Sequence, residues 1–248
     1  MKNFFAAVKF LTIIPLPGQA CRGEEGLSKS ALFFPLVGLL TGIIISVLYS
    51  ALLLFLPHVP SACLAVLAMS WISGGLHIDG VADSADGFLS GAPRDRAMEI
   101  MKDSRTGALG AFAMISIVAV KISALVVIPQ EMVATAIIIA SVAGRGAMTV
   151  AISVFKYVTA NGTGLGTLFS NGRSGISAFI SVLIVSIISL GLLGLAGFWV
   201  IVVHLFATFL FGAYSTKKIG GMTGDTYGAL CEITEALVLL VIIPFSVG

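Results

Sequence analysis

Three aspartates in the segment 79–105 have a spacing that suits metal or phosphate chemistry. Asp79, Asp83 and Asp86 stand at positions i, i+4 and i+7, which places their carboxylates within about 60° of one helix face. Carboxylates held so close repel one another unless they share a cation. Their oxygens are hard ligands for Mg²⁺ or Mn²⁺, and Mg²⁺ is usually held by few carboxylates together with substrate phosphates. The spacing predicts a metal site for a phosphate-bearing substrate; the simpler alternative is a solvated helix end.

Basic residues follow these aspartates, and the segment 79–105 holds ten of the chain's 26 charged residues. Lys102 and Asp103 lead to Arg105, which stands where the next apolar stretch begins. Ammonium and guanidinium groups donate hydrogen bonds to phosphate oxygens. We therefore expect this stretch to bind phosphate, with Arg105 placed to clamp a diphosphate. The alternative is that its cations only anchor the chain at a membrane surface.

A second acidic group follows the sequence GGMTGDTYGA at 220–229. Asp225, Glu232 and Glu235 fall within an arc of about 80° on one helix. Two glutamates inside an otherwise apolar helix require cations or buried hydrogen bonds. This group is expected to form a second half of the site.

Three further polar residues lie in or beside apolar stretches. Arg145 is an isolated cation, and its expected partner is one of the acids or a substrate phosphate. Lys121 either has a structural role, in which it only neutralises an acid, or takes part in function. His77 is a candidate ligand or proton carrier, with an ordinary core histidine as the alternative.

The composition indicates a membrane protein. The chain is 58% hydrophobic and only 10% charged, whereas a soluble domain carries about 25% charged residues. A net charge of +2 gives no reason to expect a nucleic-acid partner. Lipid is therefore the expected solvent.

The apolar stretches predict an all-α integral membrane protein, a single polytopic domain over residues 1–248. Lysine and arginine gather in alternate loops, so the positive-inside rule predicts a cytoplasmic N-terminus. The same rule puts the polar segments 79–105 and 216–235 at the cytoplasmic face, where we expect the active site. About seven transmembrane helices are expected in the cytoplasmic (inner) membrane, at 32–56, 61–78, 107–128, 133–154, 177–196, 198–215 and 227–245.

Several long, ungapped strings resemble the cobalamin synthase family, the adenosylcobinamide-GDP ribazoletransferases. They are GGLHIDGVADSADG from Gly74, KDSRTGALG from Lys102, and GGMTGDTYGA with Glu232 and Glu235. The strings FPLVG from Phe34 and GLG from Gly164 fit the same pattern. The resemblance runs from about residue 10 to 236, with one departure at Ile13, where similar proteins often have arginine.

The resemblance implies a late step of cobalamin biosynthesis. A ribose hydroxyl of α-ribazole, or of its 5′-phosphate, would attack the cobinamide-side phosphorus of adenosylcobinamide-GDP and expel GMP, with Mg²⁺ required. The expected partners besides these substrates are membrane lipid and either a second copy of the chain or other cobamide-assembly enzymes. The residues that would hold metal are Asp79, Asp83, Asp86 and Asp225, and those in the cofactor-binding set are Lys102, Asp103 and Arg145, with Lys102 and Arg105 contacting phosphate. The catalytic residues would be Asp83, Arg105 and Glu232, with Glu232 or Asp225 holding a second metal or deprotonating the hydroxyl.

Other activities remain open from the residues alone. CDP-alcohol phosphotransferases also use Asp-rich membrane helices, although an arginine expected after Ala82 is absent here. An intramembrane prenyltransferase is a further enzyme alternative. An ion-coupled transporter could use Asp79, Arg145 and Glu232 as a relay.

Overall fold

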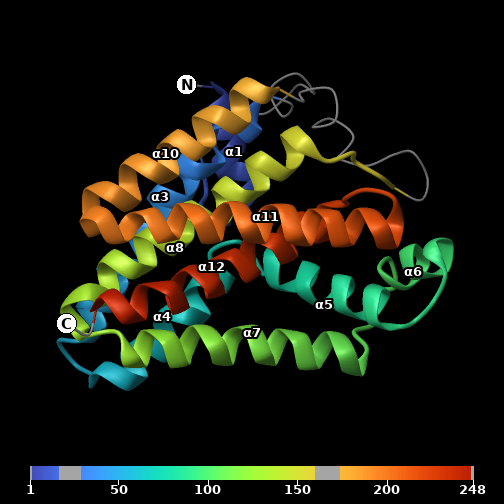
Figure 1. Cartoon of the computed structure of the whole chain (residues 1–248). Helices are drawn as coiled ribbons and strands as arrows, with labels where there is room; N and C mark the ends of the chain where they lie inside the picture. Colours follow the sequence, from blue (N-terminus) through green and yellow to red (C-terminus); the bar gives the residue numbers. More distant parts are fainter. Residues whose placement is uncertain (1, 17–28, 160–173, 247–248) are drawn as a thin grey trace.

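The computed structural model describes residues 2–16, 29–159 and 174–246, which form helices and a single isolated β-bridge (Figure 1). The all-α prediction is confirmed for these residues. The loop that contains Gly164 lies outside the described residues. The helices are α1 (Lys2–Leu11), the 3₁₀ helix η1 (Ser30–Phe33), α3 (Phe34–Leu52), α4 (His58–Trp71), α5 (Leu76–Leu89), α6 (Arg94–Ile100), α7 (Ala108–Val127), α8 (Gln130–Val154), α10 (Gly175–Leu193), the 3₁₀ helix η2 (Gly194–Ala196), α11 (Gly197–Ile219) and α12 (Gly224–Ser246).

Among the residues that the structure describes, five helical segments are long and apolar enough to cross a membrane, or six if a bent pair is counted as one span. The longest, Gly175–Ile219, contains α10 and α11, which pack side by side (Figure 1). Their turn lies at Gly194, whose φ of +58° suits glycine. The count of seven spans and the cytoplasmic N-terminus stay predictions.

The predicted span 61–78 is wrong as a single straight helix. Its residues fall in α4 and α5, whose axes differ by 81°. Gly74 and Gly75 adopt φ of +66° and +79° at the break, a left-handed conformation that ends a helix without strain only at glycine. The 14 residues of α4 rise about 21 Å, which is less than the ~30 Å of a bilayer core. The break allows α5 to leave the direction of α4 and carry its aspartates to the site.

Helix α8 forms the centre of the molecule and packs against α3, α10, α11 and α12. Gly38 and Gly42 of α3 lie on the backbone of α8 at Ser141 and Ile138, where added methyl groups would overlap it. Small residues that allow such close helix contact are typical of membrane proteins. Most of α8 is buried as a result, so its Arg145 lies inside the protein.

The polar segments meet at one end of the helical bundle. The C-terminus of α11, the end of α5 and α6 lie together there, and the N-terminus of α12 lies against the first turns of α5 (Figure 1). A parallel bridge links the chain after α8 to the α11–α12 turn: Val158 N–H donates to the carbonyl of Met222, and Met222 N–H donates to that of Lys156. This link fixes Tyr157 beside the start of α12.

Candidate active site

Helices α5 and α12 cross in close contact, and this crossing brings the two acidic groups of the sequence together. A Cβ atom at Gly80 would overlap the backbone carbonyl of Asp225. On the facing side, a Cβ at Gly228 would come within 3.0 Å of the Cα of His77. The glycines in both motifs therefore allow the helices to approach.

Replacing Gly80 by alanine is expected to separate α5 from α12. The added methyl group meets backbone rather than a flexible side chain, so we expect a loss of about 1 to 3 kcal/mol in unfolding free energy. Thermal unfolding of the purified protein would measure this loss. The control is Gly175→Ala, where a Cβ meets nothing within 4 Å; equal stability losses in both variants would show that the crossing is not the cause.

Asp83 lies at the centre of an acidic cluster that we define as Asp79, Asp83 and Asp225. Both Asp79 and Asp225 act electrostatically on the Asp83 carboxylate. Asp79 is exposed, and the other two are half-buried. Within the described residues, no three Asp, Glu, His or Cys side chains lie close enough together to hold one ion. The acidic cluster thus matches the predicted gathering of carboxylates, and the predicted metal stays a prediction.

Asp86 also acts on Asp83, but its own oxygens face another helix. They accept hydrogen bonds from the backbone N–H groups of Gly107 (2.7 Å) and Gly110 (2.8 Å) at the start of α7. These N–H groups have no partner within their own helix, so Asp86 serves as a cap supplied from α5. The structure gives Asp86 this capping role, and its predicted metal binding stays a prediction.

The basic residues after α6 divide between two places. Lys102 lies at the acidic cluster and acts electrostatically on Asp225. Arg105 points to solvent with an 88% exposed side chain and holds Asp103 through Nε and Nη2. These hydrogen bonds lower the pKa of Asp103 to about 2. Arg105 and Asp86 line a separate surface hollow of about 400 Å³, so phosphate binding by Arg105 stays a prediction.

Four buried charges form an ion network that we define as Lys121, Arg145, Glu232 and Glu235. Lys121 donates to Glu232 at 2.7 Å and also to Glu235, which in turn accepts from Arg145. Each of these side chains is at most 1% exposed, and their formal charges cancel. The expectation that Arg145 would pair with an acid is confirmed, and the lysine reaches both glutamates. The catalytic role predicted for Glu232 and the phosphate role predicted for Arg145 stay predictions.

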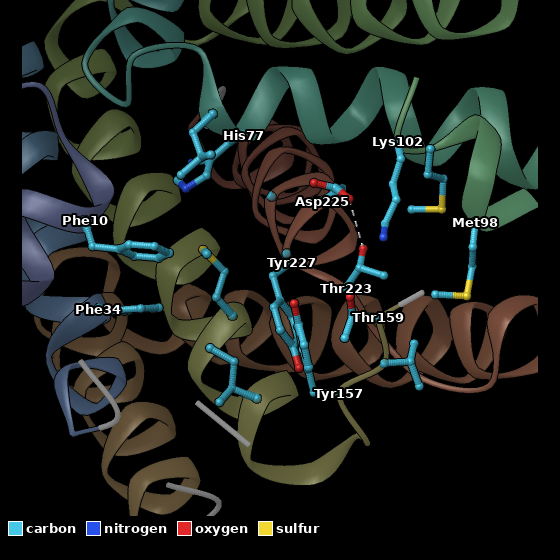
Figure 2. Close-up of a pocket in the computed structure, with 17 residues that line it drawn as sticks. Phe10, Phe34, His77, Met98, Lys102, Tyr157, Thr159, Thr223, Asp225 and Tyr227 are labelled. Atoms are coloured by element: carbon cyan, nitrogen blue, oxygen red, sulfur yellow. Dashed lines mark hydrogen bonds between the residues drawn. The ribbon is translucent and has the colours of Figure 1, made fainter. Parts of the chain in front are cut away.

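A cavity of about 310 Å³ opens beside the acidic cluster (Figure 2). Figure 2 shows His77, Phe10 and Phe34 at one side, Lys102, Thr223 and Asp225 at the other, and Tyr157 with Tyr227 between them. The Thr223 hydroxyl donates to the Asp225 carboxylate at 3.3 Å. The cavity therefore has an apolar, aromatic end and an end where charged and polar groups lie beside Met98 (Figure 2).

Sequence reasoning missed the aromatic wall of this cavity. Tyr157 and Tyr227 stack with ring centres 6.4 Å apart, and Phe10 stacks on Phe34 at 6.1 Å. The signal for Tyr227 was its place two residues after Asp225 in GGMTGDTYGA. Phe10 comes from α1 and had no such signal, because only the tertiary fold brings it here.

The helices and the site first define the class: a multi-pass helical membrane protein with a carboxylate-lined site at one end of its bundle. The sequence match then defines the family. The family described as cobalamin-5-phosphate synthase matches residues 3–243, and the chain belongs to this family.

Named relatives match over nearly their whole length. A protein of Brevibacillus brevis is 37% identical over 244 residues, which are 98% of this chain and 98% of the relative. A protein of Desulforamulus reducens is 37% identical over 96% of this chain and 94% of its own length, and one of Escherichia coli is 34% identical over 98% and 99%. All three are named adenosylcobinamide-GDP ribazoletransferase. No solved structure matches the chain.

Proposed function

We propose that this protein joins the two halves of a cobamide at the cytoplasmic face of the inner membrane. The ribose hydroxyl of α-ribazole, or of its 5′-phosphate, attacks the cobinamide-side phosphorus of adenosylcobinamide-GDP, and GMP leaves. The new P–O bond forms as the bond to GMP breaks. The observation that supports this proposal is the acidic cluster beside a nucleoside-sized cavity in a member of this family.

The donor set of the acidic cluster suits Mg²⁺. Carboxylate oxygens match this hard ion, and Mg²⁺ commonly takes only one or two carboxylates, with water and substrate phosphates as its other ligands. Asp79 and Asp83 are the residues that would hold it. When bound, the ion would neutralise charge on a diphosphate and its leaving group. Lys102 adds a positive charge at the same edge of the cavity.

Asp225 is better placed than Glu232 to accept the proton of the attacking hydroxyl. Its carboxylate lines the cavity, whereas Glu232 is buried and bonded to Lys121. A general base must come within hydrogen-bond reach of the proton it removes. We therefore assign the base role to Asp225 and assign Glu232 to the ion network that supports α12.

The test is GMP release by the purified, detergent-solubilised protein supplied with adenosylcobinamide-GDP and α-ribazole. We expect GMP to match cobalamin formation one for one, to require both substrates, and to stop when Mg²⁺ is chelated. Restoring Mg²⁺ should restore turnover. A folded protein that releases no GMP would refute the proposed transferase, and turnover that persists in chelator would refute the metal.

A further inference from the structure

His77 is a buried polar group with no partner in the described part of the chain. The residue is 0% exposed, and neither ring nitrogen has a hydrogen-bond partner there. The other two histidines differ, since His58 bonds to Tyr49 and His204 bonds to the carbonyl of Ala143. Buried polar groups are paired in nearly all native proteins. An imidazole left unpaired on a cavity wall is therefore a candidate for binding a ligand.

The walls around His77 indicate the chemistry of that ligand. His77 lines the cavity together with Phe10, Phe34 and Met148. Aromatic rings and a polarisable thioether favour flat, aromatic ligand groups. A largely apolar wall with one precisely placed polar group is typical of small-molecule sites, where the polar group fixes orientation.

The far end of the cavity suits a sugar rather than an aromatic ring. Lys102, Thr223 and Asp225 supply an ammonium, a hydroxyl and a carboxylate there, all of which form hydrogen bonds with sugar hydroxyl groups. A nucleoside has the matching polarity, with a flat base at one end and a hydroxylated sugar at the other. Placing its base beside His77 brings its ribose to Asp225.

We propose that this cavity is the acceptor site and that His77 donates a hydrogen bond to the unsubstituted ring nitrogen of the acceptor's aromatic base. This inference rests on the proposed function, which supplies α-ribazole as the acceptor. A neutral imidazole always carries one N–H donor, and an sp² ring nitrogen accepts from it. The hydrogen bond orients the aromatic ring of the acceptor so that the ribose hydroxyl lies at Asp225. Asp225 is the residue assigned above as the general base. His77 is thus a positioning and specificity residue.

The decisive experiment compares two nucleosides by calorimetric titration of the purified protein. One is α-ribazole, and the other is its analogue in which C–H replaces the unsubstituted ring nitrogen. The unchanged protein should bind α-ribazole about tenfold more tightly, as expected for one neutral hydrogen bond. His77→Phe should bind both nucleosides equally. The matched control is His204→Phe, a buried histidine outside the cavity, which should keep the tenfold preference.

Several outcomes would overturn the inference. One is equal binding of the two nucleosides by the unchanged protein, a comparison that needs no variant. Another is a His77→Phe protein that binds both more weakly but keeps their ratio. A third is a His77→Phe protein whose KM rises for adenosylcobinamide-GDP and not for α-ribazole. In that case GMP release by the unchanged protein would still support the proposed function. Selective α-ribazole binding without GMP release would instead refute the proposed function and leave the nucleoside site standing.

Discussion

Replacing Asp83 by asparagine is expected to lower GMP release by roughly 100- to 1,000-fold, the size of effect seen when one electrostatic partner of a transition state is removed. The same change should leave thermal stability equal or higher. The charges acting on Asp83 come from Asp79, Asp225 and Asp86, and all are negative. Removing one of several neighbouring like charges relieves repulsion. Activity and stability should therefore change in opposite directions, which is common at functional sites.

The measurement pairs a GMP-release assay with thermal unfolding of the same preparation. Asp95→Asn is the matched control, because Asp95 is exposed on α6 and lines neither the cavity nor the hollow near Arg105. The control should keep full activity. An Asp83→Asn protein that keeps wild-type turnover would remove Asp83 from the catalytic residues, and a large drop in its unfolding temperature would show that its carboxylate is structural.

The carboxylates of the site could be predicted from local sequence because their positions follow from helix geometry. The spacing of Asp79 and Asp83 fixes their common face once α5 is a helix. Asp225 joins them only because α5 and α12 cross. Gly80 allows this crossing, but its role is visible only after the fold is known. Asp86 shows the limit of this reasoning. It shares the face of the other two, yet its oxygens bond to the start of α7, a contact between residues 21 to 24 positions apart.

The membrane segments were predictable for a similar reason. A run of apolar residues between prolines or glycines marks a span, and α7 begins and ends within one residue of its predicted bounds 107–128. The break between α4 and α5 falls at Ile72-Ser73-Gly74-Gly75, and the paired glycines were a turn signal that the predicted span 61–78 passed over. Their left-handed conformations show that the helix ends there. Likewise, the sequence showed that Arg145 needs a partner, but not which of the acids it would meet.

The ion network leads to the second prediction with a large effect. Lys121→Met should lower the unfolding free energy by about 3 to 5 kcal/mol, the cost of leaving a buried charge without its partner. Glu235 would still bond to Arg145, but Glu232 would lose the only cation that bonds to it among the described residues. A second change, Glu232→Gln, removes that charge. The double variant should therefore be more stable than the Lys121→Met single variant. Chemical unfolding of the unchanged protein, both single variants and the double variant gives the coupling energy between the two residues.

The same pair of variants decides between two roles for Glu232. If Glu232 only balances Lys121 and holds α12 in place, the double variant should recover GMP release together with stability, because Asp225 keeps its position at the cavity. If Glu232 takes part in catalysis, the double variant should be folded and inactive. We expect recovery, since a carboxylate that is 1% exposed and bonded to a lysine is not free to accept a proton from substrate. A stable but inactive double variant would contradict this assignment and return Glu232 to the catalytic residues.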